Sequence, residues 1–182
     1  MKAKKSRARA NQAAHPAAKS FDRRDYRNAL GQFATGVTIV TARAKDGRAL
    51  GLTVNSFTSV SLDPPLVLWC LSRQASDFAA LNAAPRFAVN VLSARQHHLS
   101  RQFATTLANK FTDVELEHGP VGTPLLKGAT AHFICRVAWR LDGGDHVIIL
   151  GEVEEYRWNA GEPLVFHAGR YHVTTRHPDL SD

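Results

Sequence analysis

The chain has only two cysteines and one methionine among its 182 residues. Cys70 and Cys135 each stand among apolar residues in predicted strands, so we expect two buried, reduced thiols rather than a disulfide or a redox pair. No apolar run approaches the roughly 18 residues that a membrane-spanning helix needs. The N-terminus also lacks the apolar segment of a secretory signal. These absences predict a cytoplasmic protein without a membrane segment.

The motifs that usually mark nucleotide phosphates, nucleophilic hydrolysis and metals are also missing. There is no GxGxxG and no GxxxxGK[ST], so a nucleotide cofactor would need a site of another kind. There is no GxSxG either, which leaves hydrolase chemistry without support. His97 and His98 are adjacent and would point apart on a helix, so they do not predict a metal site.

Acidic residues are absent from the first 20 positions, which carry six lysines and arginines. These six cations account for all but one unit of the formal net charge of +7. We therefore predict a disordered basic tail over 1–20, one domain over 21–175 and a short C-terminal tail over 176–182. Because the body is nearly neutral, the sequence argues against nucleic acid as a partner, although the tail alone would be able to bind it.

Strand patterns dominate the predicted elements. Apolar residues recur at helical spacing at about 22–33, 76–82 and 94–104. Short β-branched or apolar runs predict strands at 37–41, 66–71, 87–92, 145–158, 164–166 and 169–173. Every second residue is apolar along 131–141, which predicts a strand with one buried face, and 105–127 is predicted as loop with short extended pieces. Hairpin turns at Asp46-Gly47 and Gly143-Gly144 link neighbouring strands. The pattern predicts a mainly β fold, an antiparallel barrel with peripheral helices.

The segment 51–71, GLTVNSFTSVSLDPPLVLWCL, holds a dense polar cluster between two apolar runs. Short hydroxyl and amide groups can satisfy the polar edge of a flavin ring without filling the space that the ring needs. A Ser/Thr-rich edge strand facing water would have the same composition, so both interpretations stay open. The polar members are Thr53, Asn55, Ser56, Thr58, Ser59 and Ser61.

Other residues suit the phosphate of a nucleotide. Lys110, beside Phe111, offers a point charge in an irregular segment, or is an ordinary solvated lysine. Ser72 and Ser76 lie where a strand gives way to a helix, a position that suits either an anion or a simple helix cap at Ser76.

Two further segments suit a ring or a second nucleotide. Asp145 and His146 follow the glycine turn, and the histidine could donate to a carboxamide or pyrophosphate at a barrel rim. The glycines alone are explained by the hairpin. Arg170 and Tyr171, on a late strand, could wall a planar ligand or cap the core.

Several segments, in the same order, resemble the short-chain flavin reductase family on the FMN-binding split barrel, the reductase component of two-component flavin-dependent monooxygenases. The resemblance covers about residues 22–175 and implies a homodimeric, six-stranded, Greek-key-type split β-barrel with the flavin near the dimer interface. The segments are FATGVTIVTA (33–42), GLTVNSFTSVSLDPPLVLWCLS (51–72), FAVNVLSARQHHLSRQFA (87–104), Lys110-Phe111, GDHVIILGEV (144–153) and PLVFHAGRYH (163–172).

The resemblance also implies roles for residues of this chain. Those expected at the isoalloxazine and ribityl portion of the flavin are Thr53, Val54, Asn55, Ser56, Ser59 and Ser61, with Val54 standing where many relatives have a smaller residue. Those expected near the phosphate end are Ser72, Ser76, Lys110 and Phe111, and Arg170 and Tyr171 are expected beside the site. Those expected to bind the nicotinamide nucleotide are Gly144, Asp145 and His146.

The activity implied is NAD(P)H-dependent reduction of FMN or FAD, with the reduced flavin passing to a partner monooxygenase. If the protein only positions the nicotinamide against the flavin for hydride transfer, the reaction needs no metal and no catalytic side chain. The alternatives are a flavin-retaining oxidase of the same barrel, similar to pyridoxal-phosphate oxidase, and a non-catalytic flavin-binding module. FMN or FAD, and NADH or NADPH, stay open at this point.

Overall fold

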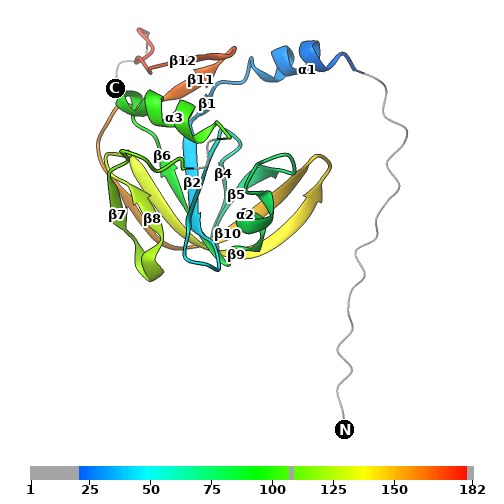
Figure 1. The fold of residues 1–182 in the computed structure, drawn as a ribbon. Coiled ribbons are helices and arrows are strands. Elements are labelled where there is room, and N and C mark those ends of the chain that lie inside the picture. The colour runs from blue at the N-terminus through cyan, green and yellow to red at the C-terminus, as the bar shows by residue number, and fades with distance from the viewer. Residues whose placement is uncertain (1–20, 107–108, 180–182) are drawn as a thin grey trace.

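The computed structural model describes residues 21–106 and 109–179. The basic tail predicted at 1–20 lies outside the described residues, as does the end of the predicted C-terminal tail at 180–182. Figure 1 shows a curled sheet with α2 and α3 packed against it, and with α1 standing apart at the start of the described chain.

Strands outnumber helices in the described part of the chain, which confirms a mainly β protein with peripheral helices. The helices are α1 (Arg23–Leu30), α2 (Phe78–Ala83) and α3 (His97–Phe103), with 3₁₀ turns η1 (Ala94–Gln96) and η2 (Pro120–Gly122). The strands are β1 (Thr35–Gly36), β2 (Thr38–Arg43), β3 (Ala49–Val54), β4 (Thr58–Leu62), β5 (Pro65–Ser72), β6 (Arg86–Val91), β7 (Leu116–His118), β8 (Pro124–Leu126), β9 (Ala131–Gly143), β10 (His146–Trp158), β11 (Val165–His167) and β12 (Arg170–His172).

Seven antiparallel strands form the main sheet in the order β3-β2-β6-β9-β10-β5-β4. Its two edges, β3 and β4, are consecutive in the chain and are joined by residues 55–57 alone. The sheet must therefore curl until its edges approach each other, although β3 and β4 are not paired, so the predicted barrel is not closed by hydrogen bonds. A second sheet, β1-β11-β12, lies beside α3 (Figure 1).

The core lies inside the curled sheet. Trp69 on β5 meets Phe87 on β6 edge to face, with 5.8 Å between ring centroids, and both side chains are buried. A second buried cluster, which includes Leu99 and Phe103, packs under α3. The cysteines do not form a disulfide with each other; Cys135 is buried as expected, whereas Cys70 is only half-buried.

The predicted buried face along 131–141 is wrong in its last third. Trp139 pairs with Leu150 and Val137 with Gly151, so Ala138 is an extra residue in β9. Such a bulge shifts the alternation of side chains between the two faces. Trp139 and Leu141 are accordingly 56% and 55% exposed, on the part of β9 that extends past its pairing with β6.

The first predicted helix is shorter and more exposed than expected. Asp22 caps α1 through its carboxylate, which accepts from the backbone N–H groups of Arg24 and Asp25 at 2.8 Å. The apolar face of the helix does not pack on its own chain, since Leu30 is 58% and Phe33, just past the helix, 77% exposed. α2 also begins two residues later than predicted, so its cap position is Asp77 and not Ser76.

Candidate functional site

A pocket of about 240 Å³ lies where β3, α3 and the second sheet meet. Thr53 and Asn55 reach it from the end of β3, and Tyr171 from β12. Thr53 and Asn55 were predicted from one segment and Tyr171 from another near the end of the chain, and the fold brings them together. The remaining lining residues are Val37, Ser100, Ala104 and Phe166.

Hydrogen bonds join three elements across this pocket. The Thr53 hydroxyl donates to the backbone carbonyl of Ser100 at 2.8 Å, and the Ser100 hydroxyl lies 2.8 Å from the Tyr171 hydroxyl. β3, α3 and β12 are thus held at fixed spacing around the pocket. We call these three residues the Thr53–Ser100–Tyr171 chain.

Aromatic rings form one wall of the pocket. Phe166 and Tyr171 pack edge to face with 5.7 Å between centroids, and the Arg101 guanidinium lies 5.8 Å from the centroid of the Tyr171 ring. A cation in that position holds the ring in place and enriches the site in positive charge.

The donor set of this pocket fits a flavin. Its walls are apolar and aromatic, as the faces of an isoalloxazine require, and Thr53, Asn55 and Ser100 supply short hydroxyl and amide groups for the polar ring edge. Its volume of about 240 Å³ lies below the roughly 300–1,000 Å³ of sites that enclose a drug-sized ligand. A bound flavin would therefore extend out of the pocket of a single chain.

The other predicted residues of the 51–61 cluster lie near this pocket in sequence but do not line it. The Ser56 hydroxyl accepts from the backbone N–H of Cys70 at 2.9 Å and so fastens residues 55–57 to β5. Val54 is buried, Ser59 is exposed, and Ser61 lies half-buried at a register shift between β4 and β5.

A second group of predicted residues gathers at the tip of the β9–β10 hairpin. His146 pairs directly with Ser72 on β5, so part of the predicted phosphate end and the predicted nicotinamide segment are neighbours. His146 Nδ1 lies 2.7 Å from a carboxylate oxygen of Asp145, and this hydrogen bond holds the pKa of Asp145 below its ordinary value. Ser76 is exposed in the turn before α2.

Arg73 connects this tip to β5, a role that the sequence alone did not assign to it. Its guanidinium donates to the backbone carbonyl of Gly144 at 3.0 Å and to the carboxylate of Asp142 at 2.8 Å. Its backbone N–H also donates to the carbonyl of Asp145 at 3.0 Å. The glycine turn is therefore held in place from the side of β5.

The structure shows Lys110 engaged by backbone groups of its own chain, and its role at a flavin phosphate stays a prediction. The side chain is buried, and its ammonium donates to the backbone carbonyls of Gly51 and Phe103, both at 3.3 Å. Burial lowers the pKa of Lys110. Phe111 packs edge to face on Phe103 with 4.9 Å between centroids. Neither Lys110 nor Phe111 lines the pocket with Thr53.

Sequence reasoning missed Ser100 and Phe166 as pocket residues. Ser100 lies in a helix whose apolar spacing drew attention only to Leu99 and Phe103. The bond from Thr53 ends on the backbone carbonyl of Ser100, which carries no signal in the sequence. Arg170, in contrast, was predicted, but it is exposed on β12 and does not line the pocket.

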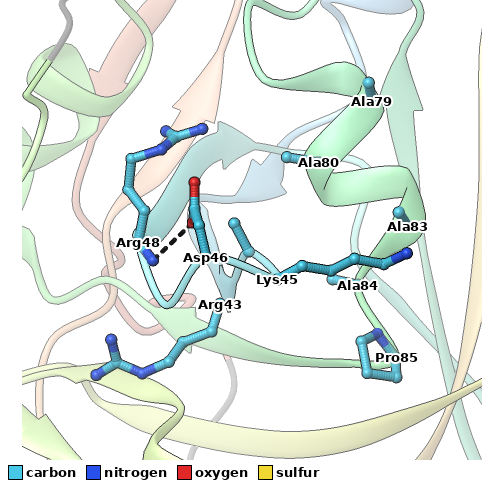
Figure 2. A pocket seen from close by; sticks show the side chains of 10 residues that line it. Arg43, Lys45, Asp46, Arg48, Ala79, Ala80, Ala83, Ala84 and Pro85 are labelled. Carbon is cyan, nitrogen blue, oxygen red and sulfur yellow. Dashed lines mark hydrogen bonds between the residues drawn. The ribbon is translucent and has the colours of Figure 1, made fainter.

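A larger pocket, of about 630 Å³, lies elsewhere (Figure 2). It is formed by the turn between β2 and β3 and by the alanine-rich surface of α2, and it contains none of the predicted site residues. Arg43, on its border, already donates to the backbone carbonyls of Gly47 and Gly122.

Within residues 21–106 and 109–179, each helix is too short or too polar to cross a membrane.

Comparisons with known proteins agree on one family. Residues 30–175 match the family described as flavin reductase like domain. The FMN reductase (NADH) SmoA of Agrobacterium fabrum is 48% identical over 148 residues, which are 81% of this chain and 84% of that protein. The reductase component of a 4-nitrophenol 4-monooxygenase/4-nitrocatechol 2-monooxygenase of Rhodococcus opacus is 43% identical over 151 residues, 83% of this chain and 80% of that protein.

Solved structures share the fold. The NADH:FAD oxidoreductase SgcE6 of Streptomyces globisporus, in complex with NAD and FAD fragments, matches with a TM-score of 0.80 and 43% identity over 88% of this chain and 96% of that chain. Some matched proteins are longer, and the chain spans 50% and 53% of two of them. The family match extends over most of the sequence and over both the pocket and the hairpin tip. The chain therefore belongs to the flavin reductase-like family.

Proposed function

We propose that this protein is an NADH- or NADPH-dependent flavin reductase that reduces FMN or FAD and supplies the reduced flavin to a partner monooxygenase. The observation that carries the proposal is the pocket in which Thr53, Asn55 and Tyr171 converge, because it joins short polar groups to aromatic walls. A relative named as an FMN reductase (NADH) supports the reduction of flavin, and a relative named as a monooxygenase reductase component supports the supply of reduced flavin to a monooxygenase.

The protein contributes positioning to this reaction. The flavin, when bound, supplies the hydride acceptor for the reduced nicotinamide. Thr53 and Asn55 would hold its polar edge, and Phe166 and Tyr171 would flank the ring. Val54, Ser56, Ser59 and Ser61 stay proposed for the adjoining ring and ribityl portion.

The hairpin tip would bind the second nucleotide. Gly144, Asp145 and His146 are proposed to hold the nicotinamide nucleotide, and Ser72 and Ser76 the flavin phosphate; Ser72 pairs with His146 across β5 and β10. Arg73 would keep the glycine turn in place through its bonds to Gly144 and Asp142. Arg170 stays proposed at the outer rim beside Tyr171.

We further propose that the fold is a split barrel that functions as a homodimer. A monomer leaves large apolar side chains on and just after α1 and on the β9–β10 hairpin exposed, among them Leu30, Phe33, Trp139 and Leu141. A contiguous apolar patch is typical of protein interfaces, and we propose that these side chains become buried in one. The pocket of one chain is also smaller than a flavin needs, so a second subunit would complete it. Light scattering on the purified protein measures its mass and so tests whether it is a homodimer.

The proposed activity is tested by following NADH and NADPH oxidation at 340 nm with and without added FMN or FAD. We expect oxidation that depends on both the nucleotide and the added flavin. Absence of a flavin-dependent rate with either nucleotide would refute the proposal. A protein that stays yellow through dialysis and ignores both nucleotides would instead indicate the flavin-retaining oxidase.

A further inference from the structure

Lys110 makes contacts that tie two elements of the flavin pocket to each other. Its ammonium donates to the carbonyl of Gly51, on β3, and to the carbonyl of Phe103, the last residue of α3. The final carbonyls of a helix have no partner within the helix and carry partial negative charge, so an ammonium stabilises them. The side chain is 5% exposed, which leaves its charge committed to these backbone groups.

Side-chain packing fixes the same contact. A Cβ atom at Gly51 would lie 2.3 Å from Phe103 Cε1, so the Phe103 ring rests directly on the backbone of β3. The Phe111 ring then packs edge to face against Phe103. We call Gly51, Phe103, Lys110 and Phe111 the α3–β3 junction.

The junction lies next to the pocket along both elements. Thr53 is two residues beyond Gly51 on β3, and Ser100 is one helical turn before Phe103 on α3. The 2.8 Å bond from the Thr53 hydroxyl to the Ser100 carbonyl therefore depends on the spacing that the junction sets. We propose that Lys110 is a positioning residue, which fastens α3 to β3 and thereby holds the Thr53–Ser100–Tyr171 chain in place for the flavin ring.

This inference rests on the proposed flavin reductase function and differs from a phosphate-binding role for Lys110. A lysine that binds the phosphate contributes to FMN but not to riboflavin, which has no phosphate. A lysine that positions the ring pocket contributes equally to both flavins. The two roles are therefore separated by comparing two ligands on one variant.

The test uses the full chain with Lys110→Met, which keeps the length of the side chain and removes its charge. We expect the Kd values of FMN and riboflavin, from fluorescence titration, to rise together by about tenfold, the size typical of losing a charged hydrogen bond. Their ratio should stay within about twofold of the wild-type ratio. Lys110→Arg, which keeps the donors, should recover part of the loss for both flavins.

Gly51→Ala provides an independent variant if Lys110→Met does not fold. It leaves the ammonium in place but displaces Phe103, and we expect the same parallel loss of both flavins. Lys127→Met is the matched control, because Lys127 is an exposed lysine paired with Glu115; it should change neither Kd.

Two results would overturn the inference. The first is a loss of affinity in Lys110→Met for FMN but not for riboflavin, which would show that Lys110 binds the phosphate. The second is unchanged affinity for both flavins in either folded variant. Failure of the proposed function would look different, since the wild-type protein itself would bind neither flavin, and the inference would fall with it.

Discussion

At the scale of single residues, Tyr171 gives the pocket both a ring and a hydroxyl. Tyr171→Phe keeps the ring packed on Phe166 but removes the bond to the Ser100 hydroxyl. We expect the Kd of FMN to rise about three- to tenfold, with a loss in unfolding free energy of about 1 kcal/mol. Flavin fluorescence titration and urea unfolding measure the two effects. Tyr156→Phe, at an exposed tyrosine of β10, is the control and should change neither.

His146 is expected to act on the nicotinamide nucleotide. In His146→Ala we expect the KM for NADH to rise more than the Kd of FMN, because the imidazole lies at the hairpin tip and not in the pocket with Thr53. Steady-state kinetics over both substrates separate the two effects, with the exposed His118→Ala as control. Equal changes in both constants would show that His146 serves the flavin instead.

Cys135 makes the stability of the fold depend on pH in alkaline solution. Burial raises the pKa of its thiol from 9.0 to about 12. The unfolded state therefore binds fewer protons than the folded state between these values, so the free energy of unfolding falls as pH rises through this window, by at most about 1.4 kcal/mol per pH unit.

Urea unfolding from pH 9 to 11 checks this prediction. Cys135→Ala should show a shallower decline with pH than the wild-type protein, and Cys70→Ala controls for the loss of a cysteine in general. A decline as steep in Cys135→Ala as in the wild type would contradict the assignment to this thiol.

At the scale of elements, the β9–β10 hairpin depends on a glycine opposite its bulge. A Cβ atom at Gly151 would lie 2.4 Å from Phe87 Cζ and 2.9 Å from Cys135 Cβ, both in the core. We expect Gly151→Ala to lower the free energy of unfolding by about 1–3 kcal/mol, as overpacking does. Thermal or urea unfolding measures this loss. Gly36→Ala, where the added methyl group would have no neighbour within 4 Å, should cost clearly less.

Elements defined by local chemistry were predictable from the sequence. The run of alternating apolar residues predicted β9, and helical spacing predicted a helix from about residue 22, where the structure shows Asp22 capping α1. The bulge at Ala138 was not predictable, because it depends on which residue of β10 lies opposite. The exposure of Trp139 follows from this bulge and from its place on β9 beyond the pairing with β6.

The residues of the candidate site also divide into those that the local sequence predicts and those that depend on tertiary packing. Thr53, Asn55 and Tyr171 were predicted from residue type and from the family resemblance, and the fold brings them together. Ser100 takes part through a backbone carbonyl, and Lys110 turns inward because two carbonyls from different elements converge on it. Contacts of this kind depend on tertiary packing and leave no local pattern in the sequence.

At the scale of the whole molecule, the exposed face of α1 and the hairpin are expected to become buried on dimerisation. The double variant Leu30→Asp with Trp139→Ser places polar groups on both surfaces. We expect light scattering to show a monomer, and the Kd of FMN to rise by roughly tenfold or more because the pocket loses its second wall. Val121→Asp, at an exposed position on η2, should leave mass and affinity unchanged. A dimer that survives the double variant would place the interface elsewhere.

The Thr53–Ser100–Tyr171 chain has a consequence for how this protein can diverge. Its neighbouring members are 47 and 71 positions apart in sequence, yet hydrogen bonds connect them in space. The Ser100 and Tyr171 hydroxyls bond each other, so losing one leaves the other unpaired, and descendants of this chain should exchange these two positions together. The Thr53 bond ends on a backbone carbonyl that any residue at position 100 keeps. Relatives adapted to a differently substituted isoalloxazine are accordingly expected to carry joint replacements of Ser100 and Tyr171, and not single ones.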